Sequence, residues 1–260
     1  MLALAGCGRL AFDPIPSGSN DDASNGDGTT GACANPIGHD EDADGVDDAC
    51  DRCPHLADAL QPDADGDKVG DACDPNPAEP RDRIVFFDPF TSARAEWTFN
   101  GAAGVIANDS LVIDARITSS LADLATGVPA NDVYAVGGHV GAGVSAQRQI
   151  HLSGFAPLTG YYYYCEIDGD QTPAAVFAAT KFDGAFVELD AAVATGPIEN
   201  RDFSLELRNH PPTYDCRSSW PAARSQVAAA IPATVTATQF TLGVGGIQVR
   251  LDYFIQIHSD

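Results

Sequence analysis

A set of aspartates at fixed spacing, present twice, constrains this chain more than any other feature of its sequence. The pattern is D-x-D-x-D-G-x-x-D-x-x-D, and its two copies lie 23 residues apart, the second with Lys68 at the glycine position. The first copy consists of Asp40, Asp42, Asp44, Asp48 and Asp51, and the second of Asp63, Asp65, Asp67, Asp71 and Asp74. Carboxylates at positions 1, 3 and 5 converge when the chain curls around a small cation. The sequence therefore predicts two cation-binding loops.

Each loop can complete its set of ligands in the same way. A backbone carbonyl at position 7, from Val46 or Val69, joins the carboxylate at position 12. Hard oxygen donors in this number favour Ca²⁺ over softer metals. Without the ion the clustered carboxylates repel one another, so we expect this segment to fold only as it binds calcium.

The negative charge of the chain is concentrated near its beginning. The 260 residues include 37 acidic and 14 basic side chains, for a formal charge of −23. Residues 1–80 hold 18 of the acidic and 3 of the basic side chains, a net −15, whereas residues 81–260 carry −8. The first segment also has few large apolar residues, so hydrophobic burial alone should not fold it. Because so negative a surface repels phosphates, we expect no nucleic-acid partner.

The joint spacing of aspartates, glycines and cysteines resembles the thrombospondin type 3 repeat. The likeness covers about residues 33–74 and is carried by Cys50-Asp51-Arg52-Cys53-Pro54 and by the run from Cys53 through Gln61 to Asp74. Lys68 stands where the family usually has glycine, Arg52 where it has asparagine, and Asp58-Ala59 where it has Asn-Pro. A non-glycine residue in a left-handed conformation costs on the order of 1 kcal/mol. We therefore expect the second loop to be distorted or weaker.

The resemblance implies calcium-binding repeats over residues 33–75, with disulfide bonds Cys33–Cys50 and Cys53–Cys73. Each bond would close a loop of about 20 residues and contribute roughly 3 kcal/mol through the entropy of the unfolded chain. Persistent disulfides place the protein in an oxidising compartment.

Four other interpretations of the acidic segment are open. A dockerin also pairs calcium loops, but Pro54 prevents the helix that would follow the first loop. Cys50 and Cys53 could form a redox pair, although the required strand-to-helix context is absent, or half of a zinc site with Cys33 and Cys73. The segment could also be an acidic, disordered tether.

The first 32 residues have the composition of an anchor followed by a spacer. Leu4-Ala5-Gly6-Cys7 resembles the lipobox of bacterial lipoproteins, in which the cysteine is acylated. Only six residues precede Cys7, so we interpret residues 1–7 as a truncated lipoprotein signal that attaches the chain to a membrane. The alternative is a frayed apolar terminus with a free thiol. Residues 8–32 predict a flexible tether, and the whole predicts a bacterial cell-envelope protein at the outer membrane, or a secreted one.

The pattern changes after a Pro-rich linker at residues 76–82. Short alternating or β-branched runs follow, separated by Gly, Asn-Asp and Pro. We predict strands near residues 83–88, 110–114, 132–140, 148–153, 160–167, 174–182, 186–190, 203–208, 238–243 and 247–258. The predicted fold class is all-β, with an antiparallel jelly-roll sandwich over residues 83–260 after the irregular calcium- and disulfide-stabilised segment. Cys165 and Cys216 would close a loop of about 50 residues, worth roughly 4 kcal/mol.

Parts of this C-terminal region resemble the concanavalin A-like (LamG-type) jelly roll. The likeness is carried by Phe87-Asp88-Pro89-Phe90 with Trp97, by the hairpin from Asn108 to Ile113, and by the closing run from Val249 to Phe254. Thrombospondins also place a lectin-like sandwich after their type 3 repeats, so the order of the parts agrees. The resemblance implies a domain that binds a glycan or an envelope protein.

One group of carboxylates invites comparison with an enzyme. Glu166, Asp168 and Asp170 are spaced like the E-x-D-x-E strand of family 16 glycoside hydrolases, in which nucleophile and acid flank a sugar bond. Here the third acid is an aspartate, and Gly169-Asp170 indicates a turn, so we expect residues of a rim or turn. No G-x-S-x-G elbow, Walker loop or His-rich metal motif occurs. We therefore predict that the protein is not an enzyme.

Four consecutive tyrosines form the other notable run. Alternation along a strand places Tyr161 and Tyr163 on one face and Tyr162 and Tyr164 on the other. One pair should pack in the core, and the other would either form a stacking platform for sugar rings or simply cover the sheet. We favour the second interpretation, because exposed apolar surface is common.

Together these features predict a calcium-binding lipoprotein whose repeats form a stiff stalk that presents a lectin-like sandwich for adhesion to a glycan or protein. The alternatives are a glycoside hydrolase of the same superfamily and a purely structural envelope protein. A carboxylate-lined groove on the concave sheet would be the most informative feature to find.

Overall fold

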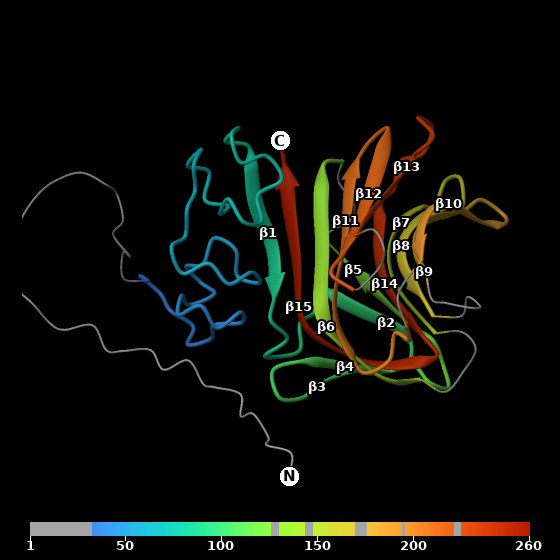
Figure 1. Ribbon diagram of the computed structural model, residues 1–260, viewed down its shortest axis with the longest axis horizontal. Coiled ribbons are helices and arrows are strands. Elements are labelled where there is room, and N and C mark those ends of the chain that lie inside the picture. Colours follow the sequence, from blue (N-terminus) through green and yellow to red (C-terminus); the bar gives the residue numbers. More distant parts are fainter. Residues whose placement is uncertain (1–32, 126–129, 144–147, 170–175, 194–195, 221–224) are drawn as a thin grey trace, which may run out of the picture. The chain divides into compact units, whose positions relative to one another are not determined.

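The computed structural model describes residues 33–260 except 126–129, 144–147, 170–175, 194–195 and 221–224. Residues 33–260 form one compact unit (Figure 1). The described residues contain fifteen strands and no helix, so they include no helix that could span a membrane. Cys7, with the anchor and tether predicted over residues 1–32, lies outside the described residues.

The strands form two antiparallel sheets. The first has the order β13-β12-β11-β6-β15-β4-β3, and β1 also pairs with β15. Its strands are β1 (Asp82–Asp88), β3 (Gly104–Ile106), β4 (Leu111–Asp114), β6 (Asp132–Gly143), β11 (Arg201–His210), β12 (Thr213–Ser218), β13 (Gln226–Ala230) and β15 (Ile247–Ser259). The second sheet has the order β10-β9-β8-β7-β14-β5-β2. Its strands are β2 (Trp97–Gly101), β5 (Ser120–Leu124), β7 (Gln149–Ala156), β8 (Tyr161–Asp168), β9 (Val176–Phe182), β10 (Phe186–Val193) and β14 (Gln239–Gly245).

The main core lies between the two sheets, and strand alternation explains how it is filled. In β11, Phe203, Leu205 and Leu207 are buried in this core, whereas the residues between them face outward. Aromatic rings join the sheets: Tyr134 of β6 stacks on Phe240 of β14 with ring centroids 4.5 Å apart. The predicted all-β sandwich is therefore confirmed.

Each strand predicted from the sequence is present, with ends shifted by a few residues. Five strands were not predicted, namely β2, β3, β5, β12 and β13. They have three to six residues each, too few to establish an alternating pattern against neighbouring turns.

The aspartate-rich segment packs on the outer face of the first sheet. Cys53, Val69 and Cys73 form a second apolar cluster with residues of β6 and β15. The strand residues in this cluster are Val133, Ala135, Ile255 and Ile257. These side chains point away from the main core and require a cover of their own. The segment therefore covers part of the outer face of the first sheet, a contact that the sequence did not predict, and its role as a stiff stalk that presents the sandwich stays a prediction.

Candidate functional site

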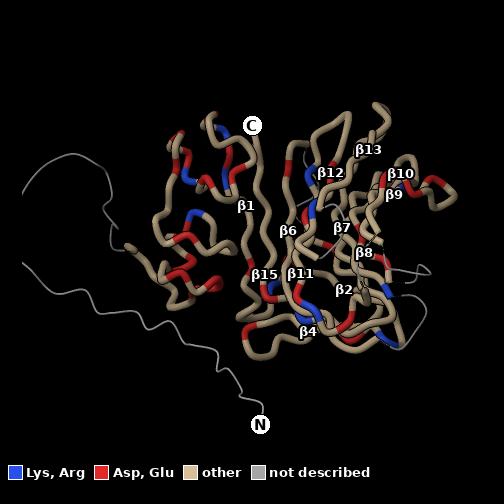
Figure 2. The backbone as a smooth tube through the Cα atoms, in the orientation of Figure 1, with Lys and Arg blue, Asp and Glu red and all other residues tan. Residues whose placement is uncertain are grey.

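The aspartate loops bring their carboxylates together as the spacing predicts. Figure 2 shows acidic residues gathered in the segment before β1. In the first loop, carboxylate oxygens of Asp40, Asp42 and Asp44 lie within 4.8 Å of one another. The second loop gathers oxygens of its three corresponding aspartates, Asp63, Asp65 and Asp67, within the same limit. Both curls therefore form in the structure.

Each loop is held in shape by an equivalent side-chain hydrogen bond to its own backbone. At position 9, Oδ1 of Asp48 accepts a hydrogen bond from the Glu41 N–H at 2.8 Å, and Oδ1 of Asp71 accepts one from the Ala64 N–H at 2.8 Å. The second oxygen of Asp48 is bonded to Nδ1 of His39 at 2.6 Å. These two aspartates thus brace their loops. Their role as calcium ligands, like that of the Val46 and Val69 carbonyls, stays a prediction.

Buried oxygens without a partner occur at the same positions of both loops. Within the described residues, Oδ2 of Asp42 and of Asp65, at position 3, makes no hydrogen bond. The same holds at position 12 for Oδ2 of Asp51 and of Asp74. A buried carboxylate oxygen without a partner is costly, and the recurrence of such oxygens at equivalent positions of both loops fits a role as cation ligands. The donor set consists of hard oxygens, so these loops fit Ca²⁺.

The crowding of carboxyl groups also raises the pKa values of two of them. Burial, followed by repulsion from Asp44 and Asp51, raises the pKa of Asp42 to about 6. Burial and the neighbouring Asp82 raise the pKa of Asp74 to about 7. Ionised carboxylates at these positions therefore need a positive charge beside them.

The described residues include three disulfide bonds, and the predicted pairings are confirmed. Cys33–Cys50 and Cys53–Cys73 belong to the aspartate-rich segment, with Cα atoms 5.6 and 5.7 Å apart. Cys165–Cys216 joins β8 to β12 and so links the two sheets through the core. These pairings exclude the zinc and redox interpretations, because paired sulfurs are neither free thiolate ligands nor a Cys50–Cys53 couple.

A carboxylate-lined groove of about 340 Å³ lies on the outer face of the second sheet. Its carboxylates are Glu166 and Asp168 of β8 and Glu188 of β10. Its other lining residues are Gln149, Val176, Ala178, Thr180 and Phe186. The intervening β9 carries the small Ala178 and Thr180 there, paired with Glu166 and Glu188 respectively, which leaves room above the sheet. The sequence did not predict that these three carboxylates lie at one groove, because their proximity depends on the pairing register of β8, β9 and β10.

Glu166 has an unusual electrostatic environment in this groove. Burial, reinforced by repulsion from Asp168 and Glu188, raises its pKa to about 7. Glu166 lies within β8, as the predicted strand over residues 160–167 has it, and Asp168 is the last residue of β8, at the rim of the sheet. Asp170, the third member of the predicted motif, lies outside the described residues.

Aromatic side chains continue along the same face. Phe155 stacks on Tyr162 with ring centroids 4.0 Å apart, and Tyr162 stacks on Tyr164 at 5.6 Å. Phe186 contacts Tyr164 at 5.7 Å and remains 70% exposed at the groove. The other two tyrosines of the run, Tyr161 and Tyr163, are buried in the main core. Strand alternation therefore splits the four tyrosines between the core and the outer face.

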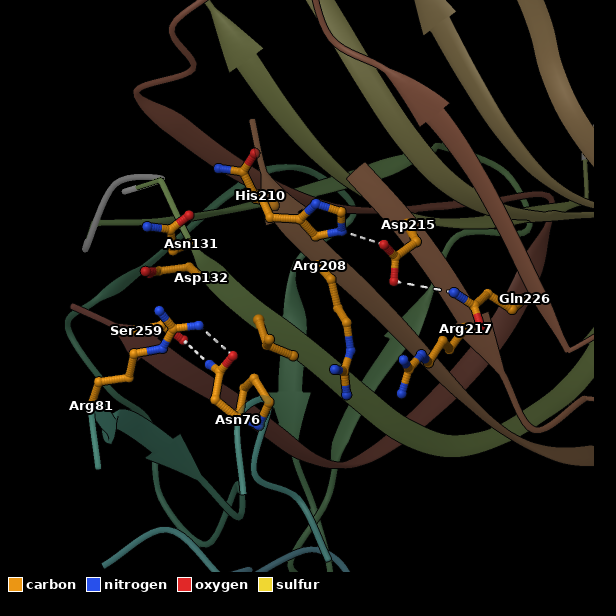
Figure 3. Close-up of a pocket in the computed structure, with 13 residues that line it drawn as sticks. Asn76, Arg81, Asn131, Asp132, Arg208, His210, Asp215, Arg217, Gln226 and Ser259 are labelled. Atoms are coloured by element: carbon orange, nitrogen blue, oxygen red, sulfur yellow. Dashed lines mark hydrogen bonds and ion pairs between the residues drawn. The ribbon is translucent and has the colours of Figure 1, made fainter. Parts of the chain in front are cut away.

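A second hollow, of about 360 Å³, lies on the outer face of the first sheet (Figure 3). It contains Arg208 and His210 of β11 and Arg217 of β12, with Asn76 and Arg81 from the segment before β1. Its charges are largely satisfied within the protein. Asp215 is bonded to both His210 and Gln226, and the Nε atoms of Arg208 and Arg217 face the carboxylate of Glu206. None of its described lining residues is a Phe, Tyr or Trp on which a sugar could stack, so it suits a sugar less well than the carboxylate-lined groove does.

The sequence matches no protein-family profile, and no curated protein matches it. Solved structures are similar in fold. An endo-β-1,3-glucanase from Pyrococcus furiosus has a TM-score of 0.52 and 10% identity, over 70% of this chain and 97% of that chain. The catalytic domain of an endo-1,3-β-glucanase (laminarinase) from Thermotoga petrophila has a TM-score of 0.51 and 10% identity, over 69% of this chain and 98% of that chain. At this identity the likeness shows the fold alone: the two sheets form a concanavalin A-like jelly roll.

Proposed function

We propose that this protein binds a glycan in the carboxylate-lined groove of its second sheet and Ca²⁺ in its two aspartate loops. The groove is the observation that carries the proposal. Its carboxylates can accept hydrogen bonds from sugar hydroxyl groups, and the exposed ring of Phe186 can stack on the apolar face of a sugar. The two glucanases of similar fold are named for β-1,3-glucan, so a β-1,3-gluco-oligosaccharide is the first ligand to test.

Binding can be tested with a glycan array that includes β-1,3-gluco-oligosaccharides. Phe186→Ala removes the exposed ring at the groove, and we expect affinity for any bound glycan to fall at least about tenfold. Ile117→Ala is the matched control, because Ile117 is 97% exposed and lies between β4 and β5, away from the groove. If the wild-type protein binds no glycan on the array, a purely structural envelope role is favoured instead.

Calcium is proposed to hold the aspartate-rich segment in its folded shape. The ion would be bound by the converging carboxylates and would supply the partner that the buried oxygens of Asp42, Asp51, Asp65 and Asp74 lack. Circular dichroism and thermal melting during a calcium titration test this role. Calcium should raise the melting temperature and a chelator should reverse the rise; no response to either would contradict the proposal.

A glycoside hydrolase is the second candidate, and the environment of Glu166 favours it. Hydrolysis by a carboxyl pair requires one protonated and one ionised group, and a pKa of about 7 keeps Glu166 partly protonated near neutral pH. We propose binding without hydrolysis, because the chain departs from the E-x-D-x-E motif. Reducing ends released from β-1,3-glucan by the wild type, but not by Glu166→Gln, would establish the hydrolase.

The remaining part of the proposal concerns location. Acylation of Cys7 would anchor the chain to a bacterial envelope membrane, with residues 8–32 as the spacer, so that the sandwich adheres to a glycan or to an envelope protein. Incorporation of labelled fatty acid into the full-length protein, abolished by Cys7→Ser, is the expected result. Equal labelling of wild type and variant would contradict it.

A further inference from the structure

A third group of carboxylates joins the aspartate-rich segment to the sandwich. Oxygens of Asp67, Asp74 and Asp82 lie within 4.8 Å of one another. Asp67 and Asp74 belong to the second aspartate loop, whereas Asp82 is the first residue of β1. Asp82 is only 4% exposed and Asp74 only 8% exposed, so these two carboxyl groups are largely removed from solvent, whereas Asp67 is partly buried.

The contacts within this group leave its negative charge uncompensated. The carboxyl groups of Asp74 and Asp82 lie within hydrogen-bonding reach of each other. Oδ2 of Asp74 is buried and makes no hydrogen bond to any described residue. No Lys, Arg or His in the described part of the chain forms an ion pair with these three aspartates. Buried carboxylates in contact are stable only if a proton or a cation lies between them.

Neutral side chains hold Asp82 in place without supplying positive charge. Nδ2 of Asn76 donates hydrogen bonds to both carboxylate oxygens of Asp82 at 3.1 and 3.2 Å. The Ser259 hydroxyl, at the end of β15, donates another. Figure 3 shows Asn76 and Ser259 side by side at the edge of the second hollow. Asp82 is thus oriented toward the loop by donors that leave its charge unchanged.

Asp82 makes the same backbone contact with the second loop that Asp58 makes with the first. There, the Asp58 N–H donates to Oδ2 of Asp44 at 2.8 Å. In the second loop, the Asp82 N–H donates to Oδ2 of Asp67 at 2.7 Å. Asp58 lies in the aspartate-rich segment ahead of the second loop, so the start of β1 takes the place of a following repeat. The first residue of β1 therefore contacts the second loop in the way that a further repeat would.

From this arrangement we infer that a Ca²⁺ ion is bound jointly by Asp67, Asp74 and Asp82 and fastens β1 to the aspartate-rich segment. The inference rests on the proposed binding of calcium by the loops and adds a ligand from the sandwich. Oxygen donors from both parts would then be held by one ion. Because β1 pairs with β15, calcium binding becomes part of the stability of the sandwich.

Asp82→Asn tests this inference in the full-length protein. The asparagine keeps an oxygen that can accept from Asn76 and Ser259, and it removes one buried charge. In chelator, the variant should melt at the same temperature as the wild type or higher. In calcium, the wild-type sandwich should gain several degrees, measured by near-ultraviolet circular dichroism of its buried aromatic residues, and the variant should lose most of that gain.

Two control variants separate the inference from simpler explanations. Asp58→Asn changes the equivalent residue of the first loop and should preserve the calcium-dependent gain of the sandwich. Ser259→Ala removes a donor to Asp82 but keeps all three carboxylates, so most of the gain should remain.

The possible failures can be distinguished by isothermal titration with calcium. If Asp82→Asn binds calcium as tightly as the wild type and keeps the full gain in melting temperature, the bridging ion is wrong while calcium binding by the loops stands. The bridging ion is also wrong if the variant melts lower in chelator and its calcium-dependent gain is unchanged, because Asp82 would then be only structural. If the wild type binds no calcium, the proposed function itself fails.

Discussion

At the scale of single residues, Lys68 is the clearest departure from the repeat. Its φ is 85°, close to the 95° of Gly45 at the same position of the first loop. The resemblance to the thrombospondin type 3 repeat, in which glycine is usual at this position, predicted a distorted or weaker second loop for this reason. Glycine adopts that conformation without the steric cost borne by a lysine.

Lys68→Gly should therefore stabilise the calcium-bound protein by about 1 kcal/mol. It also removes a positive charge beside the second loop, so calcium affinity should rise. Gly45→Lys is the matched reverse change in the first loop and should have the opposite effects. Urea unfolding in calcium measures both variants, and a Lys68→Gly protein that is less stable than the wild type would contradict this account of position 6.

Glu166 links stability to pH. Its folded pKa of about 7 exceeds its ordinary value of 4.5, so the folded protein holds this proton more tightly than the unfolded chain. The wild type should consequently lose stability as pH rises from about 4.5 to 7, by on the order of 1–3 kcal/mol from this group. The Glu166→Gln variant should not lose stability in this pH range. At pH 8 it should have a higher free energy of unfolding than the wild type, and at pH 4 the two proteins should be about equally stable. Unfolding at the two pH values checks this, and an equal change in both proteins would refute it.

At the scale of elements, the disulfide Cys165–Cys216 joins strands from opposite sheets. Its sequence separation of 51 residues implies that it restricts the unfolded chain strongly. Replacing both cysteines with alanine should cost about 4 kcal/mol of unfolding free energy, measured by urea denaturation with calcium present. A cost below about 1 kcal/mol would show that the bond adds little to what the buried strands already provide.

The elements that the sequence predicted are those whose pattern is local. The long β6 and β15 contain extended apolar runs, and the aspartate loops are defined by spacing within twelve residues. The short β3 and β13 were missed, because pairing with neighbouring strands decides their structure. The groove was missed for the same reason, since Glu166 and Glu188 meet only through the register of β8, β9 and β10.

At the scale of the whole described unit, the sequence did not predict that the aspartate-rich segment covers the sandwich. A signal was nevertheless present. Val133 and Ala135 of β6, like Ile255 and Ile257 of β15, are apolar at positions where an exposed outer face would carry polar side chains. Such two-sided strands require a second layer, and in the described part of the chain Cys53, Val69 and Cys73 of the acidic segment supply it. Its own scarcity of apolar residues hid that role.

The proposed glycan site lies on the second sheet between β8 and β10. NMR chemical-shift mapping on the full-length protein, during titration with a β-1,3-gluco-oligosaccharide or the best ligand from the array, tests it most directly. The largest changes should occur at the amides of Glu166, Ala178 and Glu188, which line the groove. Changes confined to Arg208 and Arg217 around the second hollow, or no change with any glycan, would contradict it.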